Sequence, residues 1–194
     1  MRLGEDAVGD SPPAPARTAL KLVALAGLPG TGKSVLARAV SERLGAPLLD
    51  KDRVRAALFA PEEIEYSREQ DDLVMACIHR AVEFHAARGR LPAVVLDGRT
   101  YSRRSQVDEL GALAARLGTP LFLVECTASP AVARERLERD ARAGGHPAEN
   151  RSFELHERLR AEAEPIEGAK LVLATDSAPV DELVERVLSR MARP

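Results

Sequence analysis

Residues 27–34 read Gly-Leu-Pro-Gly-Thr-Gly-Lys-Ser, which are the residue types and spacing of a phosphate-binding loop. Glycines let a backbone come close to a phosphate and adopt positive φ angles, so that its N–H groups can surround the anion. Lys33 adds a positive charge for the β- and γ-phosphates, and the Ser34 hydroxyl is a ready ligand for Mg²⁺. The stretch therefore predicts a site for ATP and Mg²⁺. We expect the nucleotide to contact Gly27, Leu28, Pro29, Gly30, Thr31, Gly32, Lys33, Ser34 and Val35.

Carboxylates that follow predicted strands are the candidates for acid–base chemistry. Phosphoryl transfer to an alcohol needs a carboxylate that orients the hydroxyl and accepts its proton. We assign this role to Asp52, which comes after a short apolar run, with Asp50 as the alternative. Asp97 ends a second apolar strand, where a carboxylate without a function would be costly to bury. We expect Asp97 to hold Mg²⁺ together with Ser34, or to position the acceptor.

Arginines follow the same strand ends and could bind anionic parts of the substrates. Arg55 lies one helical turn after Asp52 and is a candidate to hold an anionic group of the acceptor, with a solvated helix arginine as the alternative. Arg99 and Arg103 follow Asp97, and we expect them to flank the acceptor. For these two, arginines on a helix surface are the alternative explanation.

A charged segment late in the chain is a candidate lid, over about residues 130–160. It contains Arg139 and Arg142 and runs into Gly144-Gly145, a plausible hinge. Arginines that close over the transferring phosphoryl group would neutralise charge and exclude water. Ion pairs at i,i+4 spacing, which stabilise an exposed helix without any ligand, are the alternative. We assign both arginines to ATP, and we expect catalysis to involve Lys33, Asp52 and Arg139.

The elements that must position these residues alternate along the chain. Strands are predicted at about residues 20–26, 47–49, 93–97, 121–126 and 170–175, with helical patterns between them. Continuous apolar strands separated by helices are typical of a parallel sheet covered on both faces, and working residues lie at its carboxyl edge. In the long helix that ends at Gly89, the residues expected to face inward are Leu73, Val74, Cys77, Ile78, Ala81 and Phe84.

Length and composition indicate one globular domain. The chain has 194 residues, and 45% of them are hydrophobic, enough to build a full core. Residues 1–17 are rich in glycine and proline without periodicity, which predicts a disordered tail before a domain at 18–194. No apolar run is long enough to cross a membrane, and no signal peptide is evident, so we expect a cytoplasmic protein without a membrane partner.

The order of these pieces resembles an AAA-type ATP-binding kinase domain over about residues 20–190. The most similar branch of these P-loop kinases holds polynucleotide 5′-kinases, zeta-toxin-like kinases, gluconate kinases and chloramphenicol phosphotransferases. Asp52-Arg-Val-Arg55 resembles a D-x-x-R motif in which the aspartate is the base and the arginine binds the acceptor. Glu138-Arg139-Asp140 with Arg142 resembles the lid of that branch. The resemblance implies an α/β P-loop NTPase fold with sheet order 2-3-1-4-5 and an adenine site near residues 175–179.

Together these features favour an ATP-dependent kinase that acts on a hydroxyl group of a small molecule, such as a sugar, a nucleoside or an antibiotic. A polynucleotide 5′-hydroxyl kinase is the first alternative, and a nucleotide-dependent regulatory ATPase is the second alternative. Aromatic content of 3% and a net charge of −2 argue against nucleic acid. The acidic stretch at residues 62–72 would repel a phosphate backbone if it lined the acceptor groove. We interpret it as solvated surface, with a preference for a neutral or cationic acceptor such as an amino sugar as the alternative. A guanine-binding N-K-x-D motif is absent, which argues against a GTPase switch.

Overall fold

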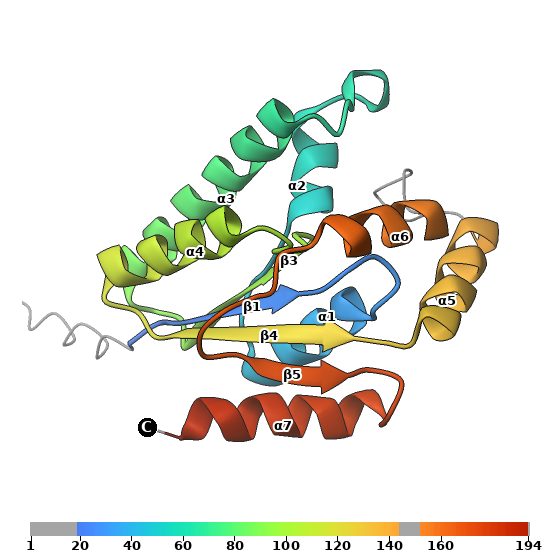
Figure 1. Ribbon diagram of the computed structural model, residues 1–194. Helices are drawn as coiled ribbons and strands as arrows, with labels where there is room; N and C mark the ends of the chain where they lie inside the picture. Colours follow the sequence, from blue (N-terminus) through green and yellow to red (C-terminus); the bar gives the residue numbers. More distant parts are fainter. Residues whose placement is uncertain (1–18, 144–151, 194) are drawn as a thin grey trace, which may run out of the picture.

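Five parallel strands form one sheet in the order β2-β3-β1-β4-β5, which confirms the expected P-loop NTPase fold (Figure 1). The computed structural model describes residues 19–143 and 152–193; the expected tail and the expected Gly144-Gly145 hinge lie outside this part. The strands are β1 (Lys21–Ala26), β2 (Leu48–Asp50), β3 (Ala93–Asp97), β4 (Leu121–Thr127) and β5 (Leu171–Ala174).

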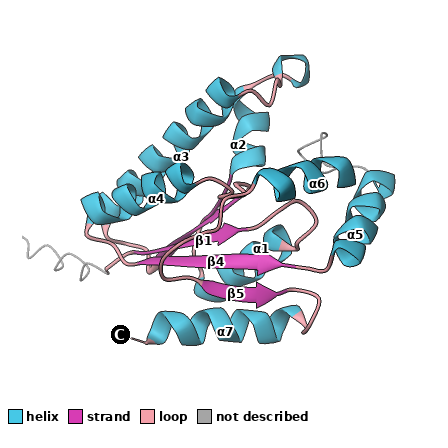
Figure 2. Cartoon of the chain, in the orientation of Figure 1, coloured by secondary structure: helices cyan, strands magenta, loops and turns pink. Residues whose placement is uncertain are grey.

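Helices cover both faces of the sheet (Figure 2). They are α1 (Lys33–Leu44), α2 (Lys51–Leu58), α3 (Arg68–Arg88), α4 (Arg104–Leu117), α5 (Pro130–Ala143), α6 (Phe153–Glu162) and α7 (Val180–Ala192). Helices α3 and α4 pack on one face, and α1 and α7 pack on the other. A short 3₁₀ turn, Pro61–Glu63, lies between α2 and α3. In the described part, no helix combines the length and apolar character that a bilayer crossing requires.

Strand β1 lies at the centre of the core. Leu22 and Ala24 point into the layer shared with α3 and α4, whereas Val23 and Leu25 point into the layer shared with α1 and α7. Because both faces of β1 are buried, its sequence is a continuous apolar run rather than an alternating one. The phosphate-binding loop, which follows β1 directly, therefore starts from the centre of the core.

The N-terminus of α1 begins inside the phosphate-binding loop. Its N-cap residue is Gly32, which has a left-handed backbone (φ 79°) and no side chain that could cap the helix. The N–H groups of the first helical turn are consequently not used by a cap, and the helix dipole places partial positive charge there. This is the local structure that favours a bound anion.

The inward face of α3 differs from the expectation. The structure buries Val74, Met75, Ile78 and Val82. It leaves Leu73, Cys77 and Phe84 exposed. The sequence of α3 carries apolar residues on two adjacent stripes, so periodicity alone could not decide which stripe faces the sheet.

Candidate active site

The phosphate-binding loop is packed closely against the end of β4 and against α5. A Cβ atom on Gly27 (φ 131°) would lie 2.3 Å from the carbonyl oxygen of Cys126, at the end of β4. One on Gly30 (φ 80°) would lie 2.7 Å from the carbonyl oxygen of Ala133 in α5. Both positions therefore require glycine for space as well as for backbone conformation. The ammonium group of Lys33 donates to the carbonyl oxygen of Leu28 at 2.9 Å, which holds it inside the loop.

Two cavities meet at Lys33 and Ser34, because both residues line each of them. The α5 cavity, of about 840 Å³, is enclosed by the start of α1, by α5 and by the segment from β5 to α7. The α3 cavity, of about 770 Å³, is enclosed by α2, the start of α3, the segment from β3 to α4, and α6. The phosphate-binding loop thus stands between two spaces, each large enough for a small substrate.

Helix α5 is connected to the phosphate-binding loop through Arg136. Its guanidinium donates to the Thr175 hydroxyl at 2.8 Å and to the Thr175 carbonyl oxygen at 3.0 Å. The Thr175 hydroxyl in turn donates to the carbonyl oxygen of Thr31 at 2.8 Å. Sequence reasoning missed Arg136, since nothing local indicates a partner 39 positions away.

The two arginines predicted to contact ATP lie in different surroundings. Arg139 lines the α5 cavity together with the phosphate-binding loop. Arg142 is exposed, lines neither cavity, and donates from its Nε atom to the carbonyl oxygen of Glu138 at 3.2 Å. The structure therefore brings Arg139 to the site and does not bring Arg142, whose proposed role would need a movement of the end of α5.

The two candidate bases lie on opposite sides of the loop. Asp50 caps α2, since its Oδ1 accepts from the N–H groups of Asp52 at 2.9 Å and Arg53 at 3.4 Å, and it lines the α5 cavity. Asp52 lines the α3 cavity, and its Oδ1 accepts from Nη1 of Arg55 at 2.9 Å. Of the two carboxylates, Asp52 is thus the one that lines the α3 cavity together with Lys33.

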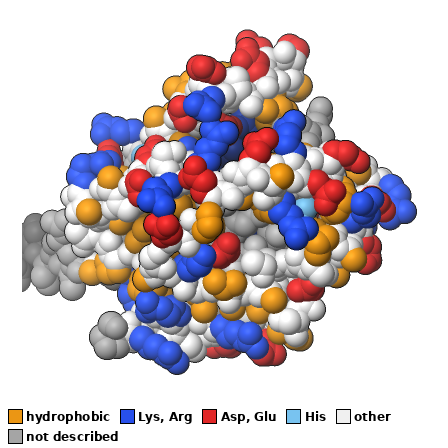
Figure 3. All heavy atoms as spheres, in the orientation of Figure 1, with side chains coloured by type: hydrophobic (Ala, Val, Ile, Leu, Met, Phe, Trp, Pro, Cys, Tyr) orange, Lys and Arg blue, Asp and Glu red, His pale blue; other side chains and the backbone are white. Residues whose placement is uncertain are grey.

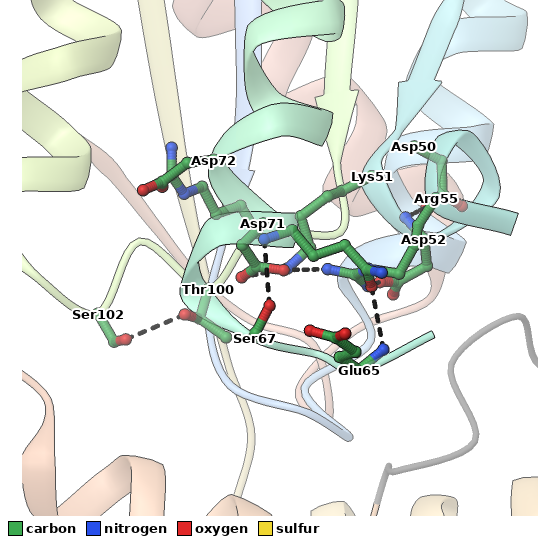
Figure 4. A network of polar contacts seen from close by, with 12 residues as sticks. Asp50, Lys51, Asp52, Arg55, Glu65, Ser67, Asp71, Asp72, Thr100 and Ser102 are labelled. Atoms are coloured by element: carbon green, nitrogen blue, oxygen red, sulfur yellow. Dashed lines mark hydrogen bonds and ion pairs between the residues drawn. The ribbon is translucent and has the colours of Figure 1, made fainter. Parts of the chain in front are cut away.

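Arg55 is a buried arginine rather than a solvated one, with 2% of its surface exposed. Its guanidinium forms ion pairs with Asp52 and with Asp71 of α3 (Figure 4). It also lies 5.0 Å from the ring centroid of Tyr66. Lys51 also contacts Asp71, with both carboxylate oxygens 3.1 Å from its ammonium nitrogen. Arg55 therefore holds Asp52 in place, and its capacity for an acceptor anion is largely taken up.

The acidic stretch before and within α3 does not act as solvated surface throughout. Asp71 and Asp72 line the α3 cavity, contrary to our interpretation from the sequence. Asp71 is neutralised by Lys51 and Arg55, and Asp72 lies 3.9 Å from a guanidinium nitrogen of Arg99. A run of like charges in the sequence could not reveal these partners, because the cations come from other elements.

Arg99 and Arg103, which the sequence predicts to flank the acceptor, both line the α3 cavity. Arg99 is 6% exposed and forms a 2.7 Å ion pair with Glu109 of α4. Arg103 is exposed at the start of α4. Arg99 is therefore held by the Glu109 carboxylate, whereas the side chain of Arg103 is open to solvent.

Asp97 fits a magnesium ligand. It is 3% exposed, and within the described residues neither of its carboxylate oxygens has a hydrogen-bond partner. Register places it beside Asp50 at the carboxyl edge of the sheet, the edge from which the phosphate-binding loop also leaves. Mg²⁺ prefers oxygen ligands and is usually held by one or two protein groups, with phosphates and water completing its shell. The Asp97 carboxylate and the Ser34 hydroxyl supply such groups.

Asp97→Asn is expected to separate folding stability from magnesium binding. Removing an unpaired buried charge should leave the Tm of the nucleotide-free protein unchanged or higher. The Mg²⁺ concentration needed for half of the ATP-dependent rise in Tm should increase at least about tenfold. Thermal unfolding across Mg²⁺ concentrations measures both, with the exposed α4 carboxylate changed in Asp108→Asn as a control. A variant with unaltered Mg²⁺ dependence would remove Asp97 from the metal site.

The same variant tests the electrostatics of Asp50. Burial, and then the charges of Asp97 and Asp52, raise the pKa of Asp50 above its ordinary value of 3.8. The folded protein therefore holds this proton more tightly than the unfolded chain, and stability falls as pH rises from 3.8 through the folded-state pKa. In Asp97→Asn this fall should be smaller, which urea unfolding at a series of pH values measures. An identical pH dependence in both proteins would contradict the coupling.

Helix α6 closes the site from above the phosphate-binding loop. Nδ1 of His156 lies 2.8 Å from the carbonyl oxygen of Pro29, and because a carbonyl only accepts, Nδ1 carries the proton. The imidazole stacks on the Phe153 ring, with ring centroids 5.4 Å apart. The guanidinium carbon of Arg134 in α5 lies 3.9 Å from the centroid of the Phe153 ring. His156 was not among the predicted site residues, and its partner lies 127 positions away.

Comparison with known proteins gives a family match and several similar folds. A family model described as an AAA domain matches residues 22–166. A cytidylate kinase from Nitratidesulfovibrio vulgaris is 35% identical over 112 residues, which cover 56% of this chain and 47% of that protein. The chain thus spans about half the length of the curated cytidylate kinases it matches.

Among solved structures, the Mycobacterium tuberculosis APS kinase CysC superposes with a TM-score of 0.67 and 20% identity, covering 91% of this chain and 99% of that one. A gluconokinase from Sinorhizobium meliloti superposes with a TM-score of 0.65 and 22% identity, covering 91% and 94%. At this level of identity the structural matches show a shared fold.

Proposed function

Because the chain belongs to the AAA domain family and has a P-loop kinase-like NTPase fold, we propose that it transfers the γ-phosphoryl group of ATP to a hydroxyl group of a small molecule. One observation carries the proposal: two substrate-sized cavities share Lys33 and Ser34, and Asp52 stands in one of them. A nucleotide switch needs a single cavity, whereas a transferase needs a donor space and an acceptor space that meet at the reacting phosphate.

The α5 cavity suits the donor. Lys33 and the N-terminus of α1 line it and suit the phosphates, and Arg139 lines it as well. The apolar side chains of Ala178, Val180 and Leu183 also line it and suit an adenine ring. Bound Mg²⁺, held by Ser34 and Asp97, would supply positive charge to the β- and γ-phosphates.

The α3 cavity suits the acceptor. Asp52 would accept the proton of the acceptor hydroxyl while the oxygen of that hydroxyl forms a bond to the γ-phosphorus. The bond from the γ-phosphorus to the β–γ bridging oxygen breaks at the same time, which releases ADP. Arg55 orients Asp52 through their 2.9 Å contact. Lys33 and Arg139 would stabilise the charge on the transferring group from two sides.

The proposal is tested by following ADP formation with sugars, nucleosides, aminoglycosides and 5′-hydroxyl oligonucleotides as acceptors. We expect ADP release to depend on a small hydroxylated acceptor, and mass spectrometry should detect its phosphate ester. Vigorous hydrolysis that no acceptor stimulates would favour a regulatory ATPase instead. Transfer confined to oligonucleotides, with strong salt dependence, would make the protein a polynucleotide kinase.

A further inference from the structure

We propose that the acceptor carries an oxyanion (a phosphate ester, a sulfate ester or a carboxylate) at a distance from the reacting hydroxyl, and that Arg68, Arg103 and Arg158 bind it. This inference rests on the proposed function, since it assigns the α3 cavity to the acceptor. It names a substrate class, adds Arg68 and Arg158 to the site, and gives Arg103 a specific role in it.

The charge balance of the α3 cavity is the first observation. Seven basic side chains and four carboxylates line it, an excess of three positive charges, although the whole chain has a net charge of −2. Figure 3 shows basic side chains on both sides of the hollow between the α2–α3 pair and α6. A concentration of positive charge in one concave site of an otherwise slightly acidic protein favours an anionic ligand.

Ion pairing separates the six basic residues of this cavity other than Lys33, which belongs to the phosphate-binding loop, into two groups. Lys51, Arg55 and Arg99 each contact a carboxylate within the cavity wall. The guanidinium groups of Arg68, Arg103 and Arg158 form no hydrogen bond or ion pair with any residue of the described chain. These three arginines therefore retain their full capacity for an anion, and they account for the excess of positive charge.

The three arginines come from three separate elements that converge on one cavity. Arg68 begins α3, Arg103 precedes α4, and Arg158 lies in the middle of α6. Helix α6 is fixed to the phosphate-binding loop by the contact from His156 to Pro29, so Arg158 has a defined position relative to the transferring phosphate. Thr100 and Ser102, whose hydroxyls lie 3.0 Å apart, add neutral hydrogen-bonding groups to the wall next to Arg103.

These features suit a small anion better than a nucleic acid. A single-stranded chain would need exposed aromatic side chains on which bases could stack. The aromatic side chain lining this cavity is Tyr66, and its ring lies against the guanidinium of Arg55. The arginines therefore offer recognition of one localised anionic group that is joined to a hydroxylated body.

The test compares matched acceptors that differ in charge. Glycerol 3-phosphate and gluconate, with neutral glycerol and glucose as their counterparts, are titrated calorimetrically into the full-length protein. Mg²⁺ and the non-hydrolysable analogue adenylyl imidodiphosphate are present throughout, so that the phosphate-binding loop is filled. We expect at least one charged compound to bind at least about tenfold more tightly than its neutral counterpart, as charge-assisted hydrogen bonds predict. This preference should weaken at high salt because the arginines lie at an exposed rim.

The double variant Arg103→Gln with Arg158→Gln should lose at least about tenfold of the oxyanion affinity and keep the affinity for the ATP analogue. Arg160→Gln is the matched control, because Arg160 is an exposed arginine on the same helix that does not line the α3 cavity. Both changed residues of the double variant are exposed, so its Tm should equal that of the wild type.

Equal binding of charged and neutral compounds by the wild type, or an unchanged preference in the double variant, would overturn the inference. So would phosphoryl transfer that is efficient with neutral acceptors and insensitive to both substitutions. The proposed function fails in a different way: oxyanions would bind through Arg103 and Arg158, but no acceptor hydroxyl would be phosphorylated.

Discussion

Asp52→Asn is expected to lower kcat by about 10²–10⁴-fold, the range typical for loss of a general base. Asparagine keeps the size of the side chain and an oxygen that can accept from Arg55, but it cannot take a proton from the acceptor hydroxyl. The affinity for ATP should change little, because Asp52 lines the α3 cavity and the nucleotide is assigned to the α5 cavity. Steady-state kinetics and calorimetric titration of the ATP analogue measure the two quantities separately.

Asp50→Asn is the matched control for this experiment. Asp50 caps α2 through its Oδ1 atom, and asparagine caps a helix about as well as aspartate, so the fold should keep its stability. We expect a much smaller effect on kcat than in Asp52→Asn. If Asp50→Asn is the inactive protein and Asp52→Asn retains activity, the base assignment is reversed.

Lys33→Met is expected to lower kcat/KM by about 10²–10³-fold, the loss seen when one preorganised donor is removed from a developing charge. Here the affinity for ATP should also fall, which distinguishes this variant from Asp52→Asn. Lys33 lies at the boundary of both cavities. Its charge would therefore act on the γ-phosphate both in bound ATP and during the transfer. A loss of Tm through the missing contact with Leu28 should be small, since one such hydrogen bond contributes about 1 kcal/mol.

Lys51→Met provides the comparison for Lys33→Met. Lys51 lines only the α3 cavity and contacts Asp71, so the ATP affinity of this variant should equal that of the wild type. Binding of the ATP analogue is measured for both variants. Wild-type affinity and activity in Lys33→Met would contradict the role of the phosphate-binding loop.

Local sequence patterns predicted the parts of this protein that depend on local structure. The glycines and Lys33 of the phosphate-binding loop are readable because backbone geometry and spacing determine them. Continuous apolar runs predicted parallel strands, since burial on both faces leaves no alternation. The strand order came from the resemblance to P-loop kinases, because hydrophobic periodicity carries no information about which strands are neighbours.

Long-range polar contacts could not be predicted in the same way. Arg136 and His156 hold α5 and α6 against the phosphate-binding loop through Thr175 and Pro29, and each pair is distant in sequence. An arginine on a charged helix is usually a surface residue, so the composition of α5 gave no sign that Arg136 makes a long-range contact. The acidic residues of α3 were misinterpreted for the same reason: whether a carboxylate repels a ligand depends on cations supplied by other elements.

The division of the site at Lys33 and Ser34 also bears on how new specificities could arise or be engineered. The walls of the α3 cavity come from residues 51–109 and α6, whereas the walls of the α5 cavity come largely from α1, α5 and the start of α7. Under the proposed assignment of the two cavities, substitutions in the first set would change the choice of acceptor and leave ATP binding intact. A library of variants in the walls of the α3 cavity would then sample new acceptors, with the residues assigned to ATP kept constant.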